Sequence, residues 1–99
     1  MSVKIKNAGK NHGKDEFTVK AQAQDKDGDD DLTKLAYEVK DTSGTVIGSE
    51  TVTRSATKKI QPGTVTISSS EDVTKSGSYT VTVTAEDSDG NTKSDSTTV

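Results

Sequence analysis

The sequence predicts an all-β protein, an antiparallel sandwich of about seven strands. Apolar and polar residues alternate strictly in two runs, and Thr and Val are common where Leu is rare. No stretch repeats its apolar residues with the 3.6-residue period of a helix. Turn-forming residues separate the alternating segments at short intervals. With 99 residues, the chain has room for a single domain, residues 1–99.

The two alternating runs predict the best-defined strands. A side-chain period of two places alternate residues on one face of a strand, where they can be buried together. Only 26% of the residues are apolar, a composition that also occurs in disordered chains, but two strictly alternating runs favour an ordered fold. The apolar positions of these runs are Phe17, Val19, Ala21 and Ala23, and then Tyr79, Val81, Val83 and Ala85.

The other strands follow from shorter patterns. Val3 and Ile5 predict a short first strand, and Leu35, Tyr37 and Val39 share one face of a strand over 33–40. The turn Asp41-Thr42-Ser43-Gly44 offers an Asp that can bond its own backbone and a Gly free to take positive φ. Beyond this turn we expect a strand over 45–53 containing Val46, a weak strand over 57–60, a break at Pro62 and Gly63, a strand through Val65 and Ile67, and a polar last strand over 91–98.

The predicted core is thin because most inward side chains are small. We expect most of its bulk to come from five residues, and burial of each contributes about 1.5–3 kcal/mol. These residues are Phe17, Leu35, Tyr37, Ile67 and Tyr79.

Composition excludes several classes of function. The chain has no cysteine, so it forms no disulfide and no cysteine metal site. No apolar run is long enough to cross a membrane, and a net charge of −3 argues against binding to nucleic acid or anionic membranes. The only histidine, His12, falls in a polar turn, and no catalytic triad or carboxylate pair stands out. We therefore expect no enzymatic activity.

One segment resembles a known family. Gly77-Ser78-Tyr79-Thr80-Val81 resembles the segment that opens strand F of immunoglobulin-like (Ig-like) domains, where a tyrosine hydroxyl bonds back to the preceding corner. The resemblance implies this role for Tyr79 and a Greek-key sandwich. The runs 77–91 and 23–29 are similar to bacterial and archaeal Ig-like, PKD-type and cadherin-like surface modules. The chain departs from antibody domains by having no Cys pair and no Trp, and from PKD domains by having Ala36-Tyr37-Glu38-Val39 in place of their signature.

The resemblance implies a non-catalytic structural or adhesive module of an extracellular or cell-surface protein. We expect it to be one domain of a longer multidomain chain, with neighbouring domains or a surface protein as partners. We expect the isolated module to be monomeric and not to insert into a membrane. Two alternatives stay open: an accessory or carbohydrate-binding module of a secreted hydrolase, and a virion or surface-layer decoration domain that would use an edge strand to associate. Three aromatic residues leave little stacking surface for sugars.

Two acidic segments echo one another. Each is an alternating strand that runs into Asp-x-Asp-Gly, first at Asp25-Lys26-Asp27-Gly28 and again at Asp87-Ser88-Asp89-Gly90. In an Ig-like sandwich the loops that follow these strands lie at the same end, beside the N-terminus. Carboxylates gathered at one end repel one another unless they are solvated or neutralised.

Calcium would neutralise such a cluster, because it takes six to eight oxygen ligands from carboxylates and carbonyls. Magnesium and zinc fit less well, since magnesium prefers few protein ligands and zinc needs His or Cys. The sequence thus suggests a calcium site, and the resemblance to cadherin-like modules implies that calcium could stiffen a tandem array. The alternative is that these segments are solvated hairpin turns. The candidate ligands are Asp25, Asp27, Asp29, Asp31, Asp87 and Asp89.

Overall fold

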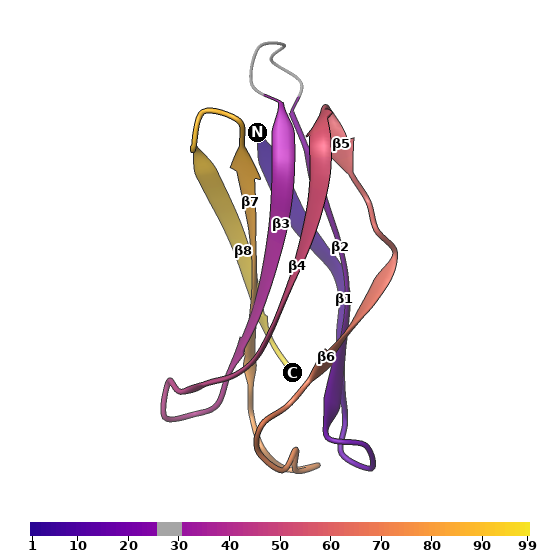
Figure 1. The fold of residues 1–99 in the computed structure, drawn as a ribbon. Helices are drawn as coiled ribbons and strands as arrows, with labels where there is room; N and C mark the ends of the chain where they lie inside the picture. The colour runs from indigo at the N-terminus through magenta and orange to yellow at the C-terminus, as the bar shows by residue number, and fades with distance from the viewer. Residues whose placement is uncertain (26–30) are drawn as a thin grey trace.

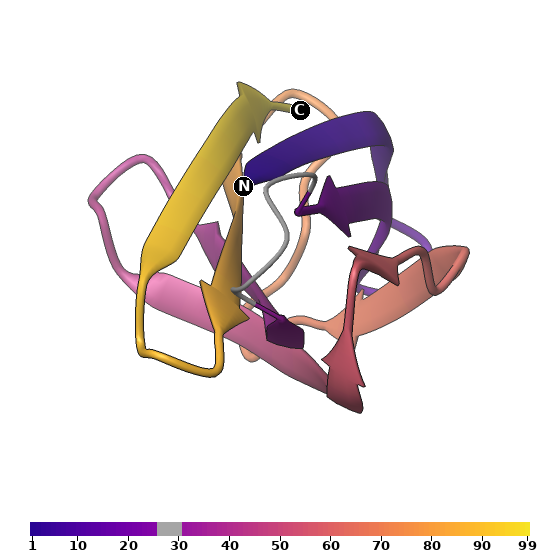
Figure 2. The ribbon, with the colours of Figure 1, turned by 90° about the horizontal axis from the view of Figure 1, so that it is seen from above.

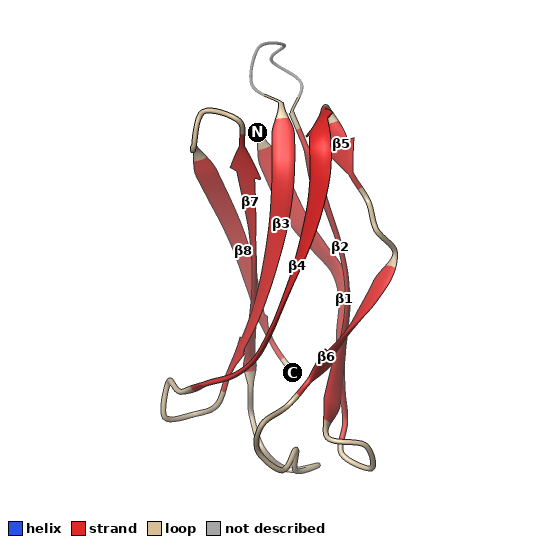
Figure 3. Ribbon diagram, in the orientation of Figure 1, coloured by secondary structure: helices blue, strands red, loops and turns tan. Residues whose placement is uncertain are grey.

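The computed structural model of the protein describes residues 1–25 and 31–99 and contains eight strands. The described part of the chain consists of strands and connecting loops and has no helix, as Figure 3 shows. The strands are β1 (Ser2–Asn11), β2 (Glu16–Gln24), β3 (Leu32–Lys40), β4 (Val46–Thr57), β5 (Lys59–Ile60), β6 (Thr64–Ser68), β7 (Thr80–Asp87) and β8 (Thr92–Thr98).

The strands form two four-stranded antiparallel sheets that pack face to face (Figures 1 and 2). One sheet has the order β1-β2-β5, and β6 also pairs with β2. The other has the order β4-β3-β7-β8. The chain crosses between the sheets after β2, after β4 and after β6. The predicted all-β antiparallel sandwich is confirmed.

Strands β5 and β6 lie end to end along the same edge of β2. The end of β2 pairs with β5 at Ala23 and Gln24, whereas its first half pairs with β6. Pro62 separates them because it has no N–H to donate to a ladder. Gly63 follows with φ of +80°, a value that favours glycine. The predicted break at these two residues is confirmed.

The core between the sheets contains the five residues that the sequence predicted, all of them buried. The rings of Phe17 and Tyr79 pack edge to face with centroids 5.1 Å apart. The alternation of the sequence did not identify four further core residues. They lie at strand ends, next to a shift in strand register, or in a loop. These are Leu32, Ile47, Ile60 and Val73.

Strand β4 shows how a bulge changes the inward face. The sequence pointed to Val46 as the apolar residue of this strand, but Val46 is 48% exposed and Ile47 is buried. The β3–β4 register shifts between Val39 and Lys40, next to Ile47. A bulge inserts one extra residue and so reverses which residues point inward. The strand also runs to Thr57, beyond the predicted end at residue 53.

Strand β1 is longer than the predicted short strand around Val3 and Ile5. It spans ten residues because it pairs with almost the whole of β2 across a bulge between Ile5 and Asn7. At this bulge the Ile5 N–H donates to Asp95 Oδ2 on β8 at 2.9 Å. A side-chain carboxylate therefore connects β1, in one sheet, to β8 in the other.

The two termini lie toward opposite ends of an elongated molecule (Figure 1). The Cα atoms extend over 43 × 23 × 18 Å. Ser2 pairs with Gln24 at one end of the sandwich, whereas Val99 exchanges backbone hydrogen bonds with Tyr79 at the start of β7. We call the end with the N-terminus the N-terminal pole and the end with the C-terminus the C-terminal pole.

Candidate functional site

The described acidic residues of the two echoing segments meet at the N-terminal pole, as predicted. The Asp25 N–H donates to the carbonyl of Lys58 at 2.9 Å. The Lys58 ammonium lies 2.7 Å from Asp31 Oδ1, and the Ser88 N–H donates to the Asp31 carbonyl at 2.8 Å. The segments on either side of residues 26–30 are thus tied to the β4–β5 junction and to the β7–β8 turn.

Asp87 organises the β7–β8 turn. It is 3% exposed, and its Oδ1 accepts hydrogen bonds from the N–H groups of Asp89 at 2.9 Å and Asn91 at 2.8 Å. Its Oδ2 accepts from Asn91 Nδ2 at 3.1 Å. Gly90 has φ of +86°, and its N–H donates to the Asp87 carbonyl. Residues 87–91 therefore form the hairpin turn between β7 and β8.

These contacts set the charge of Asp87. Partial burial alone would raise its pKa, but hydrogen bonds from Asn91, Asp89 and Gly90 outweigh burial and hold the pKa below its ordinary value of 3.8. Asp87 is therefore an anion across the neutral range. The carboxylate oxygens of Asp87 already accept hydrogen bonds from donors within its own turn.

The β3–β4 turn at the C-terminal pole repeats this arrangement. Asp41 Oδ1 accepts from the N–H groups of Ser43 at 2.9 Å and Thr45 at 3.0 Å. The Gly44 N–H donates to the Asp41 carbonyl, and Gly44 has φ of +84°. Both turns therefore need Asp first and Gly fourth, and the third residue contributes only its N–H. The acidic side chain of Asp89 is exposed and has no part in the turn's hydrogen bonds.

The remaining candidate ligands stand as follows. Asp25 is buried, at 3% exposed, directly after β2. Asp31 is paired with Lys58, and Asp27 and Asp29 lie outside the described residues. Within 1–25 and 31–99, no three His, Cys, Asp or Glu side chains are grouped closely enough to hold a metal ion.

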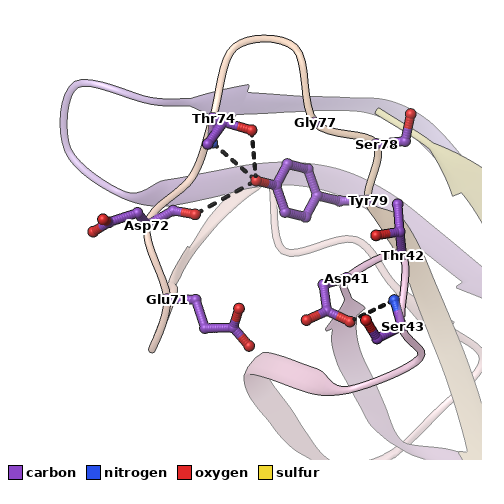
Figure 4. A pocket seen from close by; sticks show the side chains of 9 residues that line it. All are labelled: Asp41, Thr42, Ser43, Glu71, Asp72, Thr74, Gly77, Ser78 and Tyr79. Carbon is purple, nitrogen blue, oxygen red and sulfur yellow. Dashed lines mark hydrogen bonds between the residues drawn. The ribbon is translucent and has the colours of Figure 1, made fainter.

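Tyr79 closes the C-terminal pole (Figure 4). Its hydroxyl accepts a hydrogen bond from the Thr74 N–H at 2.8 Å and lies 3.3 Å from Thr74 Oγ1 and 3.5 Å from the Asp72 carbonyl. The prediction that this hydroxyl bonds back to the preceding corner is confirmed. The bond fixes the loop that connects β6 to β7.

Gly77 is required by close packing around Tyr79. A Cβ at this position would lie 2.9 Å from Tyr79 Oη and closer still to Thr74 Oγ1. The Lys10 ammonium donates to the Gly77 carbonyl and stands 5.7 Å from the centroid of the Tyr79 ring. A cation over an aromatic face is attracted to it. The Gly-x-Tyr motif therefore reflects both the close packing of Gly77 against Tyr79 and the hydrogen bond of the Tyr79 hydroxyl.

Beside Tyr79 lies a hollow of about 310 Å³ that sequence reasoning did not find. The carboxylates of Asp41 and Glu71 face each other across it in Figure 4. The pKa of Glu71 is raised by desolvation and then by the neighbouring carboxylate of Asp41. The two residues are thirty positions apart, so no local pattern could have linked them. The lining residues are Asp41, Thr42, Ser43, Glu71, Asp72, Thr74, Gly77, Ser78 and Tyr79.

The hollow does not resemble a pocket for an apolar ligand. Such pockets are lined mainly by hydrophobic and aromatic side chains. Here the lining is polar, and Tyr79 presents its hydroxyl to its own loop. The chain's three aromatic residues, Phe17, Tyr37 and Tyr79, are all described and all buried, so none offers a stacking surface for a sugar ring.

The chain matches no known protein-family model, and a search of curated proteins finds no significant relative. In the described residues, no helix is long and apolar enough to span a bilayer.

Proposed function

We propose that this protein is a non-catalytic, Ig-like spacer or adhesion module of a secreted or cell-surface protein. The strand arrangement supports this proposal. Strands β1, β2 and β6 share one sheet as strands A, B and E do in Ig domains, and β3, β7 and β8 share the other as C, F and G do. Strand β4 lies beside β3 instead of joining the first sheet. The Tyr79 contacts agree with the same assignment.

The observation that carries the proposal is the placement of the two termini at opposite poles of a molecule 43 Å long. Modules whose termini lie toward opposite ends can be joined head to tail, so each one lengthens the array. A spacer needs this property, whereas an enzyme or a small-molecule receptor needs a built pocket. The lone histidine, His12, is exposed in the β1–β2 turn and supports no catalytic arrangement.

A tandem chain of one, two and three copies tests the proposal by small-angle X-ray scattering. Each added copy is expected to lengthen the maximum dimension by roughly the 43 Å long axis of one module. A maximum dimension that stays nearly constant as copies are added would refute the spacer function. A denatured chain would also lengthen, so circular dichroism must show that each copy remains folded.

We further propose calcium as the ligand that would stiffen such an array at the N-terminal pole. Two carboxylates are buried at this pole, those of Asp25 and Asp87, and they support this proposal. The further candidate ligands are Asp27, Asp29, Asp31 and Asp89. Carboxylate oxygens are the ligands that calcium prefers.

Thermal melts in EDTA, calcium and magnesium test the calcium proposal. Calcium at 100 times its dissociation constant would stabilise the fold by about 2.7 kcal/mol. Asp25→Asn should abolish a calcium-specific rise in midpoint, and Asp72→Asn at the opposite pole is the matched control. An equal midpoint in calcium and EDTA would remove calcium from the proposal and leave the spacer function standing.

A further inference from the structure

Strand β4 has the longest free edge of the sandwich. In the described residues it pairs only with β3, and its other edge is covered only near Ile47, whose carbonyl accepts the Ser70 N–H at 2.7 Å. By contrast, β5 and β6 are short, and the Ile5–Asp95 bond connects β1 to β8. From Ser49 onward, no other described strand pairs with this edge of β4, and its backbone groups can template a further strand.

The free part of β4 is self-complementary. Residues Ser49–Ser55 read S-E-T-V-T-R-S, which is the same in both directions except that Glu50 and Arg54 exchange places. Antiparallel pairing of two copies about Val52 would set Val52 opposite itself, Thr opposite Thr and Ser opposite Ser. Each Glu50 would face Arg54 of the other copy. Opposite charges placed directly across an antiparallel pair attract each other.

We propose that β4 is a homodimerisation edge, through which two copies of this chain join their four-stranded sheets into one eight-stranded sheet. A two-fold axis at Val52 relates the copies, so each contributes the same surface. The inference goes beyond the spacer function and replaces the expectation of a monomer when the chain is concentrated or held on a surface.

The local contacts of Glu50 and Arg54 leave both side chains available. Both residues are exposed, and neither has an ion pair with another side chain among the described residues. The Arg54 guanidinium donates to the carbonyl of its own neighbour, Thr53, at 2.9 Å. Pairing would exchange this exposed contact for the carboxylate of Glu50 in the second copy. Charge-assisted bonds of this kind are stronger than neutral ones.

The composition of the segment also favours a strand as the occupant. Natural edges are protected by Lys, Pro or several like charges. Ser49–Ser55 contains none of these, and its two charges are of opposite sign. A partner strand without a matching pair of opposite charges would leave Glu50 and Arg54 unmatched, whereas a second copy satisfies both. The register shift in the β3–β4 pairing comes after Thr53, so Ser49–Thr53 runs regularly beside β3.

Charge reversal tests the pairing and its register. The Glu50→Arg chain would carry two arginines at the paired positions, and the Arg54→Glu chain would carry two glutamates, so neither can pair with itself. A mixture of the two chains would restore both ion pairs. Sedimentation equilibrium should show the wild type shifting from 10.4 kDa toward twice that mass as its concentration rises into the millimolar range. Each single variant should dimerise roughly tenfold more weakly or worse, and the equimolar mixture should recover the wild-type affinity.

Three outcomes would overturn the proposal: a wild type that remains monomeric at about 1 mM, single variants that associate as the wild type does, or a mixture that does not associate. Lys93→Glu reverses a similar charge at an exposed position of β8 and should leave the dimer unchanged. Mixing Glu50→Arg with Lys93→Glu shows whether net charge alone drives association. Thermal melts confirm that each variant is folded.

A cysteine test uses the absence of any natural thiol in the chain. Val52→Cys would place two thiols opposite each other on the axis, so mild oxidation should give a disulfide-linked dimer. Ser49→Cys would place its thiols about 20 Å apart in the same dimer, from six residues at 3.3 Å each, and should remain uncrosslinked. Equal crosslinking of the two variants, or none with Val52→Cys, would refute the register.

Discussion

The two tyrosines of this chain should respond in opposite ways to loss of the hydroxyl. Tyr79 Oη accepts the Thr74 N–H at 2.8 Å, a partly buried bond. Tyr37 Oη is buried and has no hydrogen-bond partner among the described residues. Burial raises the pKa of Tyr37 above its ordinary value of 10.0, partly offset by the charge of Arg54. Both rings are nearly buried, so Phe preserves the packing at each position.

The expected magnitudes follow from these contacts. In Tyr79→Phe the Thr74 N–H loses its partner, and an unsatisfied, partly buried donor costs about 1–3 kcal/mol. For a domain of this size, each kcal/mol shifts the midpoint by about 4–8 °C. Tyr79→Phe should therefore melt about 4–24 °C lower. Tyr37→Phe removes a buried hydroxyl without breaking a bond and should raise stability by about 1 kcal/mol or leave it unchanged.

Urea unfolding followed by circular dichroism measures both free energies of unfolding under one condition. The slope of free energy against urea should be the same for the wild type and both variants, because the exposed surface on unfolding changes little. The reasoning is refuted if Tyr37→Phe destabilises the fold as much as Tyr79→Phe, or if Tyr79→Phe is neutral.

Four other substitutions have definite expected results in thermal melts. Gly77→Ala forces a Cβ against Tyr79 and should cost about 1–3 kcal/mol, whereas Ala at the exposed Gly13 has room for its Cβ and should cost little. Asp95→Ala leaves the Ile5 N–H without its acceptor and should lower the free energy of unfolding by about 1–3 kcal/mol. Asp95→Asn keeps an oxygen at this position and should retain part of the stability. Equal midpoints for Asp95→Ala and wild type would contradict the assigned bond. The pKa of Asp87 is lowered in the folded state, so the Asp87 carboxylate stabilises the fold above its unfolded pKa. This stabilisation is lost as the pH falls through the lower folded value. In Asp87→Asn the melting midpoint should therefore fall less steeply at acid pH than in wild type. The pKa of Glu71 is raised in the folded state, so its stabilising effect is present at acid pH and is lost as the pH rises through the folded value. Glu71→Gln should therefore raise the melting midpoint at pH 7 relative to wild type. A lower midpoint would contradict the raised pKa.

The sequence predicted the regular part of the fold because side-chain alternation is a local signal. The runs that begin at Phe17 and Tyr79 became β2 and β7, whose alternate residues are buried in the common core. Where register shifts interrupt the pairing, alternation no longer identifies the inward face. Ile47 and the extra length of β1 were missed for this reason.

The candidate site divides in the same way. The meeting of the two acidic segments could be predicted from the sandwich topology, and the turn at Asp87 from its spacing to Gly90. The Asp41–Glu71 contact could not, because it depends on how the β6–β7 loop folds against a distant hairpin. Such a contact depends on how the loops pack in three dimensions, and this packing produces no periodic pattern in the sequence.

The link between β1 and β8 has a mechanical consequence. The two strands run in the same direction, from the N-terminal pole downward, and are connected by the Ile5–Asp95 bond (Figure 1). Tension applied through the termini would pull β1 toward one pole and β8 toward the other. The two strands would then slide past each other in shear. In this geometry the Ile5–Asp95 bond and the side chains between the strands resist the force at the same time and do not break one after another.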